Sequence, residues 1–120
     1  MRLLIYGGRD FVPSNRSFAF FHDLWLFQNL VGKPITKVIS GHARGADEYG
    51  EKLAEFWKIP VELYPADWDT HKKAAGFIRN QEMLDSGIDL AVQFPGGNGT
   101  KDMRKRLDKA GVRVVEYHEE

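Results

Sequence analysis

The sequence has no cysteine among its 120 residues. Neither a disulfide framework nor a zinc site with thiolate ligands can therefore form. No apolar run is long enough to cross a membrane, so we predict no membrane partner. The N-terminus leads directly into a strand pattern, and we expect no signal peptide. Together these features are compatible with a cytoplasmic protein, which is the localisation we expect.

An excess of one charge is also missing, because 17 lysine and arginine residues balance 17 aspartate and glutamate residues. Proteins that bind nucleic acid mainly through its phosphates usually carry a basic excess, so we do not expect nucleic acid as a partner. Basic residues do gather between residues 101 and 109, but acidic residues interrupt them, which favours a solvated helix face over a DNA-binding patch. The four histidines lack metal-ligand spacing, and we predict neither a metal site nor a resident cofactor.

Short apolar runs alternate with helical patterns along the chain. We predict strands at 3–6, 37–40, 61–64, 90–94 and 112–117. We predict helices at 17–31, at 46–57, from 69 or 70 to 87, and at 100–110. This alternation predicts one α/β domain over residues 1–120, a Rossmann-like three-layer sandwich with a mainly parallel sheet of about five strands. In such folds, ligands bind beyond the carboxyl ends of the strands.

Three loops that contain glycine follow predicted strands, at residues 7–10, 40–47 and 95–100. Glycine lets the backbone bend sharply and approach a ligand closely. The second and third loops open helices, whose first N–H groups and positive dipole end favour anions. Each loop alone is also typical of an ordinary turn. Three of them in the same context predict a phosphate-binding site at one edge of the sheet.

Five motifs occur in order along the chain. They are Gly-Gly-Arg-Asp-Phe at 7–11, Ser-Gly-His-Ala-Arg-Gly-Ala-Asp at 40–47, Ala-Asp-Trp at 66–68, Arg-Asn at 79–80 with Met83, and Pro-Gly-Gly-Asn-Gly-Thr at 95–100. Together they resemble the SLOG superfamily, and most closely its small stand-alone branch related to YspA. The resemblance spans residues 7–115. It implies a Rossmann-like domain that binds a nucleotide or nucleotide-derived molecule, as ligand sensors in this superfamily do.

Relatives in this superfamily include DprA-like DNA-binding proteins and the Lonely Guy phosphoribohydrolases, which cleave a base from a nucleoside monophosphate. In the latter, the glycine loop continues as Pro-Gly-Gly-x-Gly-Thr-x-x-Glu, and that glutamate works with an arginine of the preceding helix. The resemblance places Arg79 at the arginine position and Met103, which has no acid–base chemistry, at the glutamate position. Asp102 is one residue away, which on a helix is a rotation of roughly 100°.

The sequence therefore favours a binding module over an enzyme. The alternative is a hydrolase that acts on the N-glycosidic or phosphoester bond of a nucleotide, with Asp47, Asp10 or Glu82 as acid or base. Catalytic residues stay unassigned. The residues that we predict to bind the ligand are Gly7, Gly8, Arg9, Asp10, Ser40, Gly41, His42, Arg44, Gly45, Asp47, Arg79, Asn80, Pro95, Gly96, Gly97, Asn98, Gly99 and Thr100.

Three of the candidate residues have more than one interpretation. Arg79 is read either as a surface arginine on a solvated helix face or as a guanidinium that binds a phosphate in bidentate fashion. We expect its removal to weaken binding with little effect on stability. Asp47 is predicted to contact a ribose or act as a general base, or merely to complement a helix dipole. Trp68 is read either as a stacking surface for a base or as a core residue.

The helix predicted at 17–31 is apolar around nearly its whole circumference. Phe18, Phe21 and Trp25 share one face, whereas another face carries Phe20, Leu24, Phe27 and Val31. Only one face can pack on the sheet, and large exposed apolar patches usually mark interfaces. The sequence therefore predicts a homodimer or higher homo-oligomer built on this helix, unless neighbouring loops such as residues 11–13 cover the second face.

Overall fold

In the computed structural model, which describes residues 1–118, a single parallel sheet has the strand order β3-β2-β1-β4-β5. Within these residues the strands are β1 (Arg2–Tyr6), β2 (Lys37–Ser40), β3 (Val61–Leu63), β4 (Leu90–Gln93) and β5 (Arg113–Glu116). The helices are α1 (Asn15–Leu30), α2 (Ala46–Phe56), α3 (Trp68–His71), α4 (Ala75–Asp85) and α5 (Asn98–Lys109), with a 3₁₀ turn η1 (Lys72–Ala74) between α3 and α4. This arrangement confirms the predicted α/β class.

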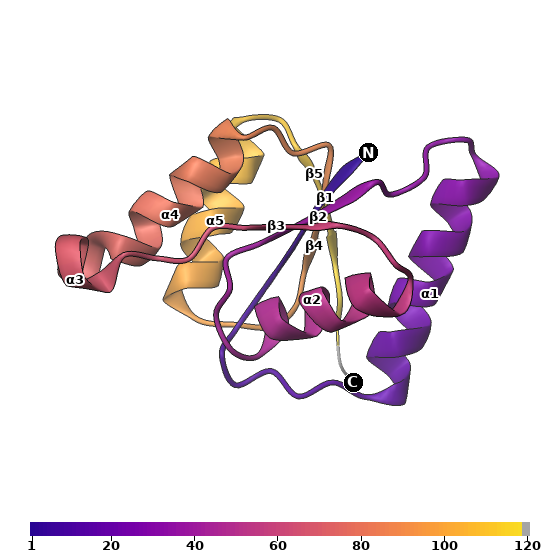
Figure 1. Cartoon of the computed structure of the whole chain (residues 1–120), viewed down its shortest axis with the longest axis horizontal. Helices are drawn as coiled ribbons and strands as arrows, with labels where there is room; N and C mark the ends of the chain where they lie inside the picture. Colours follow the sequence, from indigo (N-terminus) through magenta and orange to yellow (C-terminus); the bar gives the residue numbers. More distant parts are fainter. Residues whose placement is uncertain (119–120) are drawn as a thin grey trace.

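The helices form two outer layers, with α1 and α2 on one face of the sheet and α4 and α5 on the other (Figure 1). From β1 the chain adds β2 and then β3 on one side, and it later adds β4 and β5 on the opposite side. The crossover helices change face where the strand order reverses, as right-handed connections require. The loops that follow the neighbouring strands β1 and β4 therefore run to opposite faces of the sheet. Their separation creates the crevice where such folds bind ligands.

Each face of the sheet has its own buried core, because successive side chains of a strand point to opposite faces. Leu3 and Ile5 of β1 belong to the cluster under α1 and α2, together with Phe21. Leu4 and Met103 belong to the cluster under α4 and α5. No helix within residues 1–118 has the length and apolar character needed to cross a bilayer.

The structure divides the predicted third helix into three pieces. Asp67 caps α3 by accepting a hydrogen bond from the Thr70 N–H at 3.2 Å. Lys72, which follows α3, has a φ of +53°, and α4 begins only at Ala75. The prediction of a continuous helix from 69 or 70 was wrong because no side chain of α3 or η1 is buried. Packing therefore does not hold this segment in line with α4, whose end near Gly87 agrees with the prediction.

Helix α1 covers more of its apolar surface than the sequence suggested. Phe21 is fully buried, and Phe18 stacks on Trp57, the residue after α2, with ring centroids 5.4 Å apart. On another side, Phe20 packs against Tyr117 at 5.2 Å. Both faces of the amino-terminal half are thus engaged within the monomer, whereas Phe27 and Val31 of the second predicted face are 53% and 48% exposed. Leu26 and Leu30 are exposed as well, and Phe18 stays 38% exposed beside its aromatic contacts.

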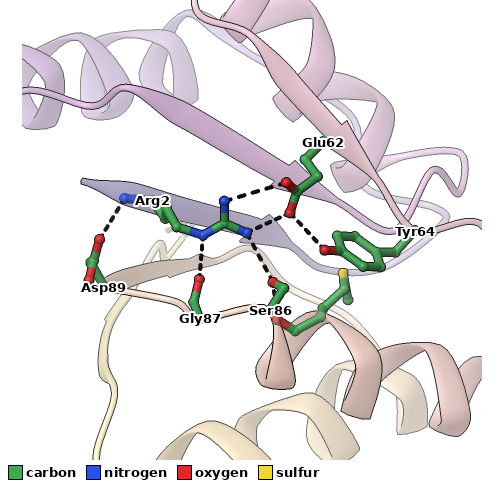
Figure 2. A network of polar contacts seen from close by, with 7 residues as sticks. Arg2, Glu62, Tyr64, Ser86, Gly87 and Asp89 are labelled. Carbon is green, nitrogen blue, oxygen red and sulfur yellow. Dashed lines mark hydrogen bonds and ion pairs between the residues drawn. The ribbon is translucent and has the colours of Figure 1, made fainter.

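A polar network fixes the end of α4 to the sheet (Figure 2). The Arg2 guanidinium of β1 donates to Glu62 of β3 at 2.5 Å, to the Gly87 carbonyl at 2.7 Å and to the Ser86 hydroxyl at 3.1 Å. The Tyr64 hydroxyl donates to the same Glu62 carboxylate at 2.7 Å. Hydrogen bonds from Arg2 and Tyr64 lower the pKa of Glu62. The network sets the position of α4, which carries Arg79 to the opposite end of the sheet.

Candidate functional site

The loops after β1, β2 and β4 meet at the carboxyl edge of the sheet, near the starts of α2 and α5 (Figure 1). The backbone of Gly8 joins them, because its N–H donates to the Pro95 carbonyl at 2.9 Å and its carbonyl accepts from the Ala46 N–H at 3.1 Å. The sequence predicted that these loops lie together. The structure confirms their proximity and shows that they hold each other in place.

Most glycines of these loops are required by the packing between loops. A Cβ on Gly7 would lie 2.8 Å from the Cβ atoms of Ala46 and Phe94. A Cβ on Gly45 would lie 2.6 Å from the Arg9 carbonyl oxygen, and one on Gly96 would lie 2.6 Å from the Gly8 nitrogen. These separations are too short for side chains. The sequence analysis attributed such glycines to ligand approach, whereas the close contact between loops explains them without a ligand.

Gly97 and Gly99 differ from the other loop glycines. A Cβ on either residue would meet no atom within 4 Å, and neither has a positive φ. Both border a cavity of about 360 Å³, a volume within the range of small-molecule sites. We call this cavity the first compartment. Its lining residues are Gly8, Arg9, Trp68, Lys73, Gly76, Phe77, Arg79, Asn80, Gly97, Gly99 and Thr100.

A second cavity of about 530 Å³ adjoins the first and shares Arg9, Trp68 and Arg79 with it. We call it the second compartment. Its other lining residues come from the loop after β2 and the segment after β3: Gly41, His42, Ala43, Arg44, Pro65 and Ala66. Arg9, whose guanidinium lies 5.2 Å from the Trp68 ring centroid, sits at the boundary. The two compartments therefore form one cleft that is divided by this arginine–tryptophan pair and Arg79.

Arg79 links α4 to the loop after β2. Its Nη1 donates to the Gly41 carbonyl at 2.5 Å, and its Nε donates to the Asn80 side-chain oxygen at 3.2 Å. Burial lowers the pKa of Arg79, while the nearby Asp47 carboxylate acts in the opposite direction. The expectation that removing Arg79 has little effect on stability assumed an exposed side chain, and the structure contradicts that assumption. Arg79 both borders the cleft and supports one of its walls.

Asn80 is a buried connector rather than a freely accessible ligand group. It is 5% exposed. Its Nδ2 donates to the Asp102 carboxylate at 3.0 Å and to the Gly99 carbonyl at 3.4 Å. Through these bonds and the one from Arg79, Asn80 ties α4 to the first turn of α5. It therefore positions both Arg79 and the glycine segment of the first compartment.

Asp47 lies behind the cleft, in the first turn of α2. It is 6% exposed and accepts a hydrogen bond from the Ala43 N–H at 3.3 Å. Burial raises the pKa of Asp47 to about 6, although the positive charge of Arg79 and the Ala43 N–H oppose the shift. Asp47 borders neither compartment. The structure thus places it as a support for the loop after β2 and as a charge partner for Arg79.

The buried carboxyl of Asp47 predicts a specific pH dependence. Because the folded pKa of about 6 exceeds the ordinary aspartate value of 3.8, the native state binds more protons than the unfolded state between these limits. The free energy of unfolding should fall as pH rises from about 4 to 6, by about 2–3 kcal/mol from this residue. Asp47→Asn should remove that slope in urea unfolding curves. An equally steep slope in the variant would assign the dependence to other groups.

Ser40 and His42 belong to one hydrogen-bonded group at the end of β2. Ser40 is fully buried, donates to Glu51 at 2.7 Å and accepts from the His42 N–H at 3.1 Å. The His42 Nδ1 lies 3.1 Å from the same Glu51 carboxylate, and His42 has a φ of +58°. Ser40 therefore shapes the loop beneath the cleft, contrary to its predicted contact with ligand, and His42 borders the second compartment.

The remaining predicted residues lie around the rim. Asp10 and Arg44 form an exposed ion pair at 3.3 Å, of which Arg44 borders the second compartment. Pro95 and Gly96 line a third hollow of about 460 Å³, which shares Gly8, Arg9 and Gly97 with the first compartment. Asn98 begins α5 without bordering either compartment.

Sequence reasoning missed Lys73 and Phe77, which border the first compartment. In a helical pattern, a lysine usually indicates a solvated face and a phenylalanine usually indicates the core. Neither residue therefore indicated a ligand site in the sequence. Trp68, for which two interpretations were open, is 47% exposed and borders both compartments. It is not a core residue. The break between α3 and α4, which the sequence did not predict, brings these side chains to the cleft.

Acidic groups do not border the cleft. Within residues 1–118, the linings of both compartments contain no aspartate or glutamate. Met103, at the position of the Lonely Guy glutamate, is 1% exposed and packs in the core under α5. Asp102 is occupied by hydrogen bonds from Arg106 at 2.8 Å and Asn80 at 3.0 Å. The lining of the two compartments therefore offers the hydrolase alternative no carboxylate, and the exposed Asp10 carboxylate lies at the rim, 3.3 Å from Arg44.

The fold and the cleft define the chain as a Rossmann-like α/β domain with a cationic crevice at its topological switch point. No family model and no solved structure matches the chain. It is similar to the Gene 61 protein of Mycobacterium phage D29, with 38% identity over 87 residues, which cover 67% of this chain and 70% of the phage protein. The chain belongs to the same protein family as this phage protein.

Proposed function

We propose that the chain binds a phosphate-bearing nucleotide or nucleotide derivative in the first compartment. The observation that carries the proposal is the chemistry of the cleft wall, which contains Arg9, Lys73 and Arg79 and, among the described residues, no carboxylate. Such a wall favours an anionic ligand and disfavours a cationic one. Its place beyond the carboxyl ends of β1 and β4 is where open α/β sheets bind nucleotides.

The first turn of α5 supplies the phosphate contact in this proposal. Gly97, the N-cap residue, provides no side-chain hydrogen bond to the helix start, and Gly97, Gly99 and Thr100 border the first compartment. Backbone N–H groups and the positive end of the helix dipole favour a phosphate there. The guanidinium of Arg79 would complete the contact with a charge-assisted hydrogen bond.

Two exposed aromatic rings supply a surface for the base. Trp68 is 47% exposed and Phe77 is 44% exposed, and both border the same compartment. Exposed rings beside a cationic wall suit a planar, aromatic group attached to a phosphate. The ligand of this proposal is therefore a nucleotide rather than free phosphate.

The five sequence motifs support membership of the SLOG superfamily, which we also propose. A sensor role suits the absence of carboxylates from both compartments of the described chain better than hydrolysis does. Nucleotides of this kind are cytoplasmic metabolites, and the cytoplasm is the compartment that the proposal requires.

Gly99→Ala provides the test of this site. Because a Cβ at this helical position meets no atom within 4 Å, the fold should tolerate it, with a gain of about 0.5 kcal/mol in stability. The same Cβ would stand in the first compartment, and we expect calorimetry to show about tenfold weaker binding of AMP, roughly 1.4 kcal/mol. Lys105→Ala, an exposed change on the same helix, is the control. Absence of AMP binding by the unmodified protein at millimolar concentration would count against the proposed function.

Self-association through the carboxyl-terminal half of α1 is a separate proposal. Leu26, Phe27, Leu30 and Val31 are between 42% and 77% exposed and lie close together on or just after the helix. An apolar cluster of this kind favours a homodimer. We expect light scattering at micromolar concentration to give a dimer mass that Leu30→Asp reduces to a monomer mass. Val12→Asp, at a 73% exposed position elsewhere, should leave the dimer intact, and a monomer mass for the unmodified chain would refute the proposal.

A further inference from the structure

The second compartment is larger than the first and is not needed by a mononucleotide that occupies the first. It measures about 530 Å³, against about 360 Å³, and opens on the far side of Arg79 and Trp68. The loop after β2 supplies four of its nine lining residues, and two hydrogen bonds hold that loop in place. The Gly41 carbonyl accepts from Arg79, and the Ala43 N–H donates to buried Asp47. The compartment is thus a formed part of the cleft.

Cationic side chains dominate this second space. Arg9, Arg44 and Arg79 border it together with His42, and no aspartate or glutamate of the described chain does so. The Arg44 guanidinium lies 3.3 Å from Asp10, in a pair whose side chains are 72% and 95% exposed. Such exposed pairs are weak, so Arg44 can turn toward an anion without a large loss. The cationic side chains of this wall therefore favour an anionic ligand group in the second compartment.

The aromatic surfaces indicate how a ligand would be oriented. Phe77 borders only the first compartment, whereas Trp68 lies at the boundary. A base is thus better accommodated in the first compartment, and beyond Arg79 the wall offers mainly cations and small residues. Arg9 and Arg79 face both spaces and can bind anionic groups on either side.

We infer that the ligand is a nucleoside polyphosphate, whose first phosphate lies at the start of α5 and whose next phosphate lies beyond Arg79, beside Arg44 in the second compartment. The inference rests on the proposed function, because it takes the position of the first phosphate from it. It adds the chemical class of the ligand and a role for the loop after β2. A nucleoside monophosphate fills only part of this cleft.

Calorimetry with AMP and ADP, without added metal, tests the inference through the ratio of their dissociation constants. We expect ADP to bind the unmodified protein at least tenfold more tightly than AMP, because charge-assisted hydrogen bonds are among the strong ones. Arg44→Gln should reduce this ratio to about one to three. Arg113→Gln removes the same charge from an exposed position at the amino end of β5 and should leave the ratio unchanged.

The outcomes separate this inference from the proposed function. If AMP binds and ADP gains nothing, the nucleotide site stands and the second phosphate site is refuted. If ADP gains affinity that Arg44→Gln does not reduce, the second phosphate lies elsewhere and the inference also fails. If neither nucleotide binds, both proposals fall. Equal losses from Arg44→Gln and Arg113→Gln would show a general charge effect and would refute the assignment to the second compartment.

Discussion

Replacing Gly45 with alanine is expected to destabilise the protein by about 3 kcal/mol or more. Gly45 has a φ of +79° with a ψ of −122°, a combination outside the left-handed helical well that costs an alanine roughly 1–3 kcal/mol. The new Cβ would also lie 2.6 Å from the carbonyl carbon and oxygen of Arg9. Those atoms belong to the backbone of the neighbouring loop, so relief would require the loops to separate, and overpacking of this kind typically adds 1–3 kcal/mol.

Gly111→Ala is the matched control for this prediction. Gly111 follows α5 with a φ of +75°, but its Cβ would meet no atom within 4 Å. It therefore has a positive φ without the collision, and we expect a loss of about 1 kcal/mol in urea unfolding. Similar losses at both positions would show that the loops are not tightly packed, contrary to the geometry around Gly8.

Introducing the glutamate of the Lonely Guy motif by Met103→Glu is expected to cost about 4 kcal/mol or more. Met103 is 1% exposed and packs with Leu4, Met83 and Leu107 between α5 and the sheet. A carboxyl group there loses its hydration without a nearby cation, whichever protonation state it adopts. Much of the protein could unfold, because this loss is comparable to the total stability of many small domains.

Met103→Leu, a change that keeps the volume and apolar character, should cost less than about 1.5 kcal/mol. Thermal and urea unfolding of the two variants give the comparison. We also expect no release of free base from AMP by the glutamate variant, because residue 103 faces the core and not the cleft. A stable Met103→Glu protein that cleaves AMP would overturn this view and support the hydrolase alternative.

The substitutions at Gly45 and Met103 test two different features of the structure. Gly45 tests whether the loops at the sheet edge form a rigid frame, and Met103 tests whether a glutamate at this position can supply the chemistry of the Lonely Guy hydrolases. A rigid frame with a cationic interior can bind an anion without large rearrangement, which reduces the entropic cost of binding. These properties suit a binding or sensor protein, as proposed above.

The sequence by itself determined the class of fold. Short apolar runs alternate with helical patterns, and β1, with Leu3 and Leu4 buried on opposite faces, shows why such runs indicate a sheet covered on both sides. The sequence also placed the three glycine loops at the carboxyl edge, because parallel strands all end there. Helix boundaries near glycine, such as the end of α5 before Gly111, followed from the need for a positive φ.

Only the tertiary structure decided what the individual residues of that edge do. Gly45 and Gly99 look alike in the sequence, but one packs against a neighbouring loop and the other borders a cavity. Asp47 is buried behind the loop after β2, whereas Lys73 reaches the cleft because α3 and α4 are separate helices. These differences depend on distances between segments that the strand order brings together. Local patterns encode which face of an element is apolar, but they do not encode which loop will lie against it.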